Sequence, residues 1–240
     1  MVVAPLTDMA DLNQPSDLPS SLFLARGDEV SDYRPFFTGD VIDGLQIPGV
    51  DEDGPAVLID HPCSMRRGPK LRSHLLAARV VSQPAALKDG AWPVAGFFDY
   101  FPLPDLPVGT INQAISLGLI GRVRNADLGG LQRVACLSSE GITLLWQRKI
   151  FREARLVVPL PTLGDLIAPK IDEVELWECW SEDLAPSLVA GGMTLADALE
   201  KTGEDFSAFL DENGHRVALE DVHLRADVRR AVRAEIRRLT

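Results

Sequence analysis

The chain has 240 residues, 46% hydrophobic and 25% charged, which is the composition of a globular protein with enough apolar side chains for one large core or two smaller ones. Its formal net charge of −11 argues against nucleic-acid binding over the whole surface, because phosphate contacts need concentrated Lys and Arg. Acidic residues dominate positions 1–60 and basic residues gather later, so a local basic patch is compatible with this average.

No apolar run approaches the roughly 18 residues of a membrane helix, and the first residues lack the basic and apolar parts of a secretory signal. We therefore expect a cytoplasmic protein that does not associate with a membrane. Cys63, Cys136 and Cys179 lie far apart and are odd in number, which fits a reducing compartment. The cysteines and histidines lack the paired spacing of a metal site, so we predict no metal, and we also predict no cofactor.

Residues 1–35 are rich in acidic residues, Pro and Ser and hold few large apolar side chains. This composition predicts a flexible acidic N-terminal arm in which only Leu22-Phe23-Leu24 docks onto the body of the protein.

Residues 36–161 change to short apolar runs cut by Gly and Pro, a pattern typical of an antiparallel β domain. We expect the aromatic stretch from Trp92 to Pro107 to be an ordered loop, because repeated prolines forbid a central strand. Residues 142–150 are predicted to form a short helix. The apolar runs with strand character are 40–42, 44–48, 56–59, 75–81, 131–137 and 153–159.

Residues 170–240 are predicted to form a helical C-terminal module, which makes the chain an α+β protein. A helix from Asp172 carries Trp177 and Trp180 on its apolar face and is expected to stop at Pro186. The two tryptophans could stack on a base, but at this spacing they are more often core residues.

Two further helical segments are expected after Gly191-Gly192. Thr194 is predicted to cap the first, with Asp197 in a variant of the capping box, and a turn at 201–203 separates it from another short apolar face. The last helix, residues 219–239, has a narrow apolar stripe, with arginines on its other faces. These arginines could bind nucleic acid, but a solvated, salt-bridged face is favoured.

The segment 56–70 is the most informative part of the chain, because a buried-strand pattern runs directly into a loop with a histidine, a thiol, a hydroxyl and cations. His61 and Cys63 lie two apart, so strand alternation would place both side chains on one face. A catalytic dyad or half of a metal site is conceivable, yet no second ligand pair or orienting group accompanies them. A turn-forming histidine and a small buried cysteine are favoured.

The loop also holds a cluster of four cations around a turn at Gly68-Pro69, namely Arg66, Arg67, Lys70 and Arg72. Such a loop can bind a phosphate or a carboxylate, because guanidinium groups are planar and bidentate, or it can be a solvated loop that balances the acidic first quarter of the chain. We predict an anion-recognition loop. Its ligand-binding residues are Ser64, Lys70 and Arg72.

Residues 39–81 resemble the opening of the MazF/PemK family of small-barrel toxins through Gly39-Asp40-Val41-Ile42, the strand after Gly54-Pro55, and a later strand ending at Val80-Val81. The resemblance implies a small curved antiparallel β-barrel. It also implies a metal-independent endoribonuclease that uses an arginine before the second strand and a hydroxyl at its end to promote attack by the ribose 2′-hydroxyl.

This chain departs from the family pattern, because Gly54 replaces the arginine and Asp60 replaces the hydroxyl residue. Catalytic substitutes in the following loop are His61 as base and the arginines as stabilisers of the developing phosphorane charge, with Ser64 beside them. The candidate catalytic residues are thus His61, Arg66 and Arg67.

Our leading hypothesis is a toxin-like barrel that acts, without efficient catalysis, as a binding or accessory component of a bacterial defence or toxin–antitoxin type system. One alternative is an active endoribonuclease of the MazF/PemK type, and another is a structural protein-interaction subunit. The partners expected are a protein or RNA at the local basic loop. The amphipathic helices are also compatible with a homodimer.

Overall fold

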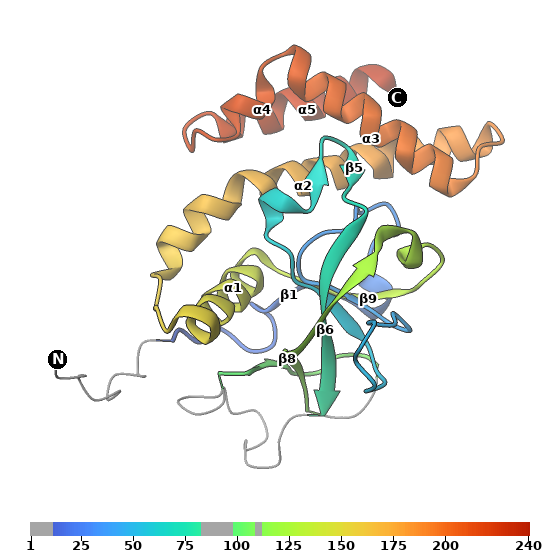
Figure 1. Cartoon of the computed structure of the whole chain (residues 1–240). Helices are drawn as coiled ribbons and strands as arrows, with labels where there is room; N and C mark the ends of the chain where they lie inside the picture. The colour runs from blue at the N-terminus through green and yellow to red at the C-terminus, as the bar shows by residue number, and fades with distance from the viewer. Residues whose placement is uncertain (1–11, 83–97, 109–111) are drawn as a thin grey trace. The chain divides into compact units, whose positions relative to one another are not determined.

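The computed structural model describes residues 12–82, 98–108 and 112–240 (Figure 1). By their internal contacts these residues divide into two compact units. The helical unit comprises Ser31–Phe37, His61–Arg72 and Ile167–Thr240, and the sheet unit comprises the other described residues. The N-terminal residues 1–11 and the first part of the predicted aromatic loop, residues 92–97, lie outside the described residues.

The sheet unit is built on a curled antiparallel sheet whose described strands run in the order β1-β9-β2-β3-β6-β8-β7. Together with the helical unit it confirms the predicted α+β class. The strands are β1 (Phe23–Arg26), β2 (Asp40–Ile42), β3 (Ala56–Leu58), β6 (His74–Ser82), β7 (Tyr100–Leu103), β8 (Gln113–Arg124) and β9 (Arg133–Leu137).

The longest pairing in the sheet joins β6 and β8, whose register runs from His74 opposite Arg124 to Ser82 opposite Gln113, with an irregularity after Ala78. Gly121 on β8 makes room for a covering side chain, because a Cβ there would lie 2.5 Å from Cγ2 of Ile47. The run 44–48 therefore packs onto the sheet face through buried Leu45 and Ile47 without pairing as a strand.

Two strands differ from the sequence-based expectations. β1 belongs to the sheet and pairs with β9, with Phe23 opposite Leu137, although residues 1–35 were expected to form an arm with one docked segment. β7 forms within the expected aromatic loop and includes Pro102. It tolerates the proline because it lies at the end of the strand order, where one side of the strand needs no ladder hydrogen bonds.

The predicted helix after β9 is confirmed as α1 (Ser139–Ala154). Ser138 caps its first turn by accepting a hydrogen bond from the Gly141 N–H at 3.0 Å. The helix ends at Arg155, which adopts a left-handed conformation with φ of 56°. The strand expected over 153–159 does not form, because the helix occupies its first residues and the chain enters the next helix at Leu160.

The helical unit contains α3 (Leu195–Glu212), α4 (His215–Ala218), α5 (Arg225–Leu239) and most of α2 (Leu160–Ala190). Thr194 caps α3 as predicted, with its hydroxyl accepting the Asp197 N–H at 3.1 Å. Neither Pro186 nor residues 201–203 interrupt a helix, so α2 and α3 are longer than expected. No helix of the described residues is both long and apolar enough to cross a membrane.

The core of the helical unit is a cluster of aromatic and aliphatic side chains. It includes Trp177 and Trp180, which confirms the prediction that both are core residues. Trp177 and Trp180 are 8% and 2% exposed, and Phe206 of α3 lies against both rings. Gly203 allows α3 to approach α2 closely, because a Cβ there would overlap the indole ring of Trp177. The other buried members are Leu176, Leu210, Leu219, Val228, Val232 and Ile236.

Candidate functional site

The predicted anion-recognition loop belongs to the helical unit. After Asp60 the chain forms the short helix η3 (Pro62–Ser64) and a small hairpin of β4 (Arg66–Arg67) and β5 (Lys70–Leu71). Gly68 makes the hairpin turn with φ of 61°, a conformation that favours glycine. The turn expected at Gly68-Pro69 is thereby confirmed, and it carries the predicted site residues into the unit that holds the C-terminal helices.

Arg66 is engaged inside the helical unit on three sides. Its guanidinium donates to the carbonyl of Pro69 at 2.7 Å and to that of Phe36 at 2.9 Å. Its Cζ lies 4.6 Å from the ring centroid of Trp177, a cation–π distance. This arrangement ties the hairpin and the 31–37 segment to α2, which is a structural use of the side chain.

His61 and its neighbours form a tight local turn. The Nδ1 atom of His61 accepts a hydrogen bond from the Cys63 N–H at 3.2 Å, and the hydroxyl of Ser64 donates to the His61 carbonyl at 2.9 Å. Nδ1 is therefore unprotonated in this arrangement, because it serves as an acceptor. The role of His61 as a turn-forming residue, favoured from the sequence, matches these bonds.

Cys63 lacks the electrostatic environment of a nucleophile. Burial raises the pKa of its thiol, and the nearby ammonium of Lys170 offsets only part of that shift. A thiol with a raised pKa is mostly protonated near neutral pH, and the thiolate is the reactive form. All three cysteines are free thiols, and the described residues hold no group of three or more His, Cys, Asp or Glu that could bind a metal ion.

The remaining cations of the hairpin are exposed to solvent. Arg67, Lys70 and Arg72 are all exposed, and Arg67 faces Lys70 across the hairpin. The Lys70 ammonium lies 4.0 Å from carboxylate oxygens of both Glu200 and Glu204 on α3. These contacts are exposed and therefore contribute little stability.

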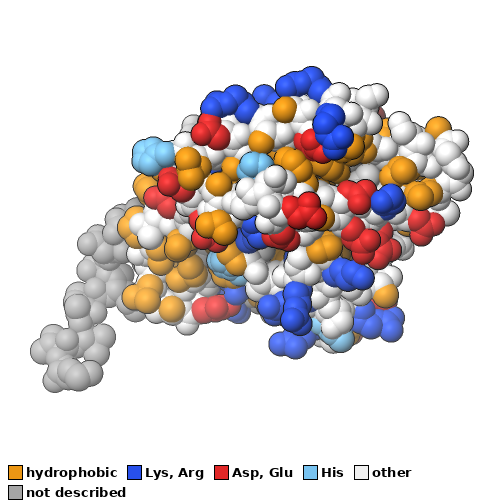
Figure 2. Space-filling view, turned by 90° about the horizontal axis from the view of Figure 1, so that it is seen from above, with side chains coloured by type: hydrophobic (Ala, Val, Ile, Leu, Met, Phe, Trp, Pro, Cys, Tyr) orange, Lys and Arg blue, Asp and Glu red, His pale blue; other side chains and the backbone are white. Residues whose placement is uncertain are grey.

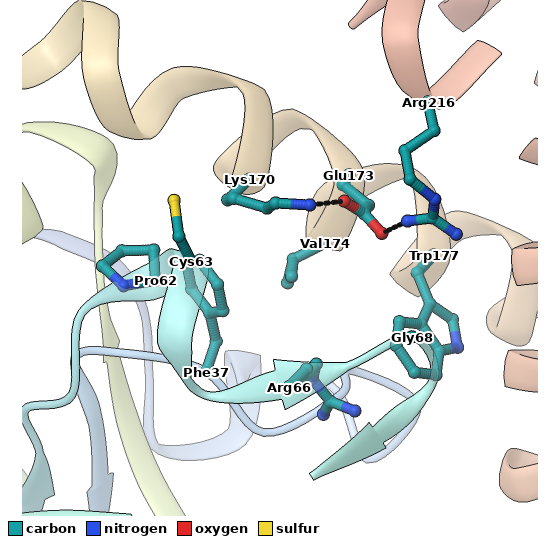
Figure 3. Close-up of a pocket in the computed structure, with 10 residues that line it drawn as sticks. All are labelled: Phe37, Pro62, Cys63, Arg66, Gly68, Lys170, Glu173, Val174, Trp177 and Arg216. Atoms are coloured by element: carbon teal, nitrogen blue, oxygen red, sulfur yellow. Dashed lines mark hydrogen bonds and ion pairs between the residues drawn. The ribbon is translucent and has the colours of Figure 1, made fainter. Parts of the chain in front are cut away.

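A pocket opens within the helical unit beside η3 and the hairpin (Figure 3). Its volume is about 50 Å³, with room for a few water molecules or one small anionic group. Helix α2 supplies one side of it, and α4 adds one cation. The lining residues are Phe37, Pro62, Cys63, Arg66, Gly68, Lys170, Glu173, Val174, Trp177 and Arg216.

Glu173 sits at the centre of the charges that line this pocket. Its carboxylate accepts from the Lys170 ammonium at 2.7 Å and also pairs with Arg216, as the dashed lines of Figure 3 show. Burial favours a lower pKa for Arg216, but Asp211 and Glu173 outweigh it and raise that pKa. Hydrogen bonding to Arg216 lowers the pKa of Asp211 in turn.

The pocket therefore combines three cations, Arg66, Lys170 and Arg216, with a single carboxylate. Such a set can bind an oxyanion, because ammonium and guanidinium groups donate several hydrogen bonds to phosphate or carboxylate oxygens. Burial raises the pKa of the Cys63 thiol at the edge of the pocket, which disfavours the reactive thiolate.

Of the predicted site residues, the structure brings only Arg66 into the pocket. Cys63 also lines it, and this residue is exposed although the sequence favoured a small buried cysteine. Lys170, Glu173 and Arg216 were missed by sequence reasoning. The spacing of Lys170 and Glu173 is that of an ordinary helical ion pair, and Arg216 lies in a separate short helix, so no local pattern connects them to the loop. A scan against protein-family models and a search of curated proteins both found no match to the chain.

Proposed function

We propose that this protein is a toxin-like small-barrel protein that acts as a binding or accessory component of a bacterial defence or toxin–antitoxin type system, without efficient catalysis. The helical unit binds a phosphate group in the pocket beside η3. The observation that carries the proposal is the engagement of Arg66 with two carbonyls and the Trp177 ring, on the rim of a pocket that also holds Lys170 and Arg216.

Two positions of the sheet unit support a binding function over catalysis. Asp60, which stands where the resembled family has a hydroxyl residue, accepts the backbone N–H of Leu76 at 2.5 Å. Gly54, which stands where that family has an arginine, offers only backbone, and its carbonyl accepts from the buried Arg79. Both positions thus serve the packing of the sheet.

The charge balance of the pocket favours a phosphate group as the ligand. Its three cations exceed its one carboxylate, and its volume matches a single small oxyanion. A phosphate offers more acceptor oxygens than a carboxylate, so it can engage Lys170 and Arg216 while Glu173 remains between them. The free ion and the phosphorylated end of a nucleotide share this chemistry, so inorganic phosphate and a 5′-phosphorylated dinucleotide are used as separate probes.

A fluorescence titration with inorganic phosphate tests the proposal, because Trp177 lines the pocket. We expect a saturable change in tryptophan emission, weakened roughly tenfold in Lys170→Ala and in Arg216→Ala. Lys201→Ala is the matched control, because Lys201 also forms a helical ion pair, with Asp205, but lines no part of the pocket. Equal titrations in all variants would refute the pocket as the site.

A second assay addresses the enzymatic alternative. Mixed RNA is incubated at neutral pH with a chelator and with the wild type, His61→Ala or Arg66→Ala. The proposal predicts an unchanged RNA ladder throughout. Cleavage by the wild type that is lost in His61→Ala, or in an Arg66→Ala protein shown by circular dichroism to be folded, would instead establish a metal-independent ribonuclease of the MazF/PemK type.

One observation favours the protein-interaction subunit as a second candidate function. Val217 on α4 and Val222 and Leu224 in the segment before α5 are 73%, 63% and 42% exposed. Exposed apolar side chains grouped in one segment are typical of contact surfaces for other proteins. Light scattering after size-exclusion chromatography would show whether the wild type forms a homodimer that Val222→Asp disrupts.

A further inference from the structure

Helix α5 is amphipathic, and its apolar face is already used inside the helical unit. Val228, Val232 and Ile236 are 1%, 0% and 6% exposed and belong to the same core cluster as Trp177 and Trp180. The face cannot at the same time enter a lipid surface or the groove of a partner. Any ligand of α5 therefore has to be bound by its polar side.

The opposite side of α5 carries Arg230, Arg233 and Arg237. Residues three and four apart on a helix are neighbours, so these three side chains form one stripe, which we name the arginine ridge. With a rise of 1.5 Å per residue, the ridge is about 10 Å long. Ala226 and Ala234 are exposed beside it, and their small side chains leave the guanidinium groups accessible.

Within the part of the chain that the structure describes, the arginines of α5 outside the ridge form ion pairs, whereas within the ridge only Arg230 does so. Arg225 and Arg229 both pair with the buried Asp172 of α2, and Arg238 pairs with Glu235. Within the ridge, Arg230 pairs with Asp227 but remains 73% exposed. Among the described residues, neither Arg233 nor Arg237 has an ion-pair partner.

We propose that the arginine ridge binds the phosphate backbone of a nucleic acid. Exposed guanidinium groups in a row match a polyanion, because each can donate two parallel hydrogen bonds to one phosphate. Figure 2 shows charges of both signs intermingled on the face it presents, with basic side chains gathered in separate groups. The net charge of −11 disfavours contact with a polyanion over most of the surface, so nucleic-acid binding requires a local basic stripe such as this one.

The composition of the ridge favours a nucleic acid over an acidic protein as the partner. Protein interfaces are built on a buried apolar or aromatic centre, with charged residues at the rim. Within Arg225–Leu239, which the structure describes completely, Leu239 is the only exposed large apolar side chain, and it lies at the very end of the helix. A surface with exposed charge and no apolar centre fits a phosphate backbone better.

The inference goes beyond the proposed function and does not depend on the phosphate pocket. Fluorescence anisotropy with labelled oligonucleotides of about 20 residues tests it, with single-stranded RNA, single-stranded DNA and duplex DNA as separate arms. We expect binding that weakens with salt. For three phosphate contacts, the slope of log K against log salt is about −2 for a single strand and about −3 for a duplex.

The decisive variant is Arg233→Gln with Arg237→Gln, which removes two charges and keeps good helix formers. We expect its affinity to fall at least tenfold with unchanged circular dichroism, while Arg233→Lys with Arg237→Lys retains most of the binding. Arg122→Gln with Arg124→Gln is the matched control, because both arginines are exposed on β8. Lys170→Ala, which disables the pocket, is expected to bind normally.

Three results of the oligonucleotide assays would overturn the inference. They are no binding in any arm at 50 mM salt, an unchanged affinity in the Arg233/Arg237 glutamine variant, and an equal loss in the β8 control. Tighter binding to a labelled poly-glutamate peptide than to each nucleic acid would also overturn it, because it would identify an acidic protein as the partner.

Discussion

The guanidinium of Arg66 lies 4.6 Å from the ring centroid of Trp177, which joins the loop at residues 61–72 to the core of the helical unit. We expect Arg66→Ala to lower the free energy of unfolding by about 2–3 kcal/mol, because it removes this cation–π contact and two hydrogen bonds from a charged donor. Urea denaturation followed by circular dichroism measures the change. Arg66→Lys should recover only part of the lost stability, since an ammonium group cannot form the two hydrogen bonds of the planar guanidinium in the same geometry. A stable Arg66→Ala protein would argue that the side chain is held for ligand binding alone.

Two helix-interior glycines should respond in opposite ways to alanine. Gly203→Ala is expected to cost about 1–3 kcal/mol, because its Cβ would overlap the ring of Trp177. Gly164→Ala should stabilise by about 0.5–1 kcal/mol, since no atom lies within 4 Å of its Cβ and alanine favours the helix. Thermal unfolding of both variants measures these two changes in stability. A neutral Gly203→Ala would contradict the close approach of α3 to α2.

Removing the carboxylate of Glu173 should strengthen phosphate binding. In Glu173→Gln, Lys170 and Arg216 lose their shared negative partner and attract an anion more strongly. We expect affinity for inorganic phosphate to rise roughly fivefold, since a partly exposed charge interaction is worth about 1 kcal/mol. The fluorescence titration measures it, with Asp211→Asn as the comparison, because Asp211 also pairs with Arg216 but does not line the pocket. Weaker phosphate binding in Glu173→Gln would show that Glu173 is needed to position the cations.

The Cys63 thiol should react slowly at neutral pH. Burial raises its pKa, so its protonated form prevails until the solution becomes clearly alkaline. We expect iodoacetamide to modify Cys63 more slowly than free cysteine at pH 7.5, with a rate that climbs as the pH passes the raised pKa. Lys170→Ala should slow it further, because that ammonium favours the thiolate. Rates come from peptide mass spectrometry. Faster modification than free cysteine at pH 7.5 would contradict the raised pKa and favour the catalytic dyad over the structural role.

Much of the fold could be predicted from local patterns. Short apolar runs marked β2, β3, β6 and β9, and the Thr194 cap marked the start of α3, because these signals depend on neighbouring residues only. β8 was missed, although it is the longest strand described, since Gly118 and Gly121 interrupt its apolar alternation. Gly121 is explained only by Ile47, a contact that no local pattern reveals.

The candidate site was only partly predictable. The loop at residues 61–72 drew attention through its composition, and Arg66 indeed lines the pocket. The surroundings of Arg66 in the pocket are formed by Glu173, Trp177 and Arg216. These residues are remote in sequence and come together only when the helical unit folds. Helical periodicity shows which residues of α2 share a face, but it does not show which loop meets that face.

Isothermal titration calorimetry with a 5′-phosphorylated RNA dinucleotide, in the presence of a chelator, tests the central claim most directly. Binding without catalysis predicts a saturable heat that is weakened in Lys170→Ala, is unchanged in Lys201→Ala, and is absent with the unphosphorylated dinucleotide. Continuous heat from turnover, or identical heats with and without the 5′-phosphate, would contradict the proposal that this protein binds phosphate without catalysis.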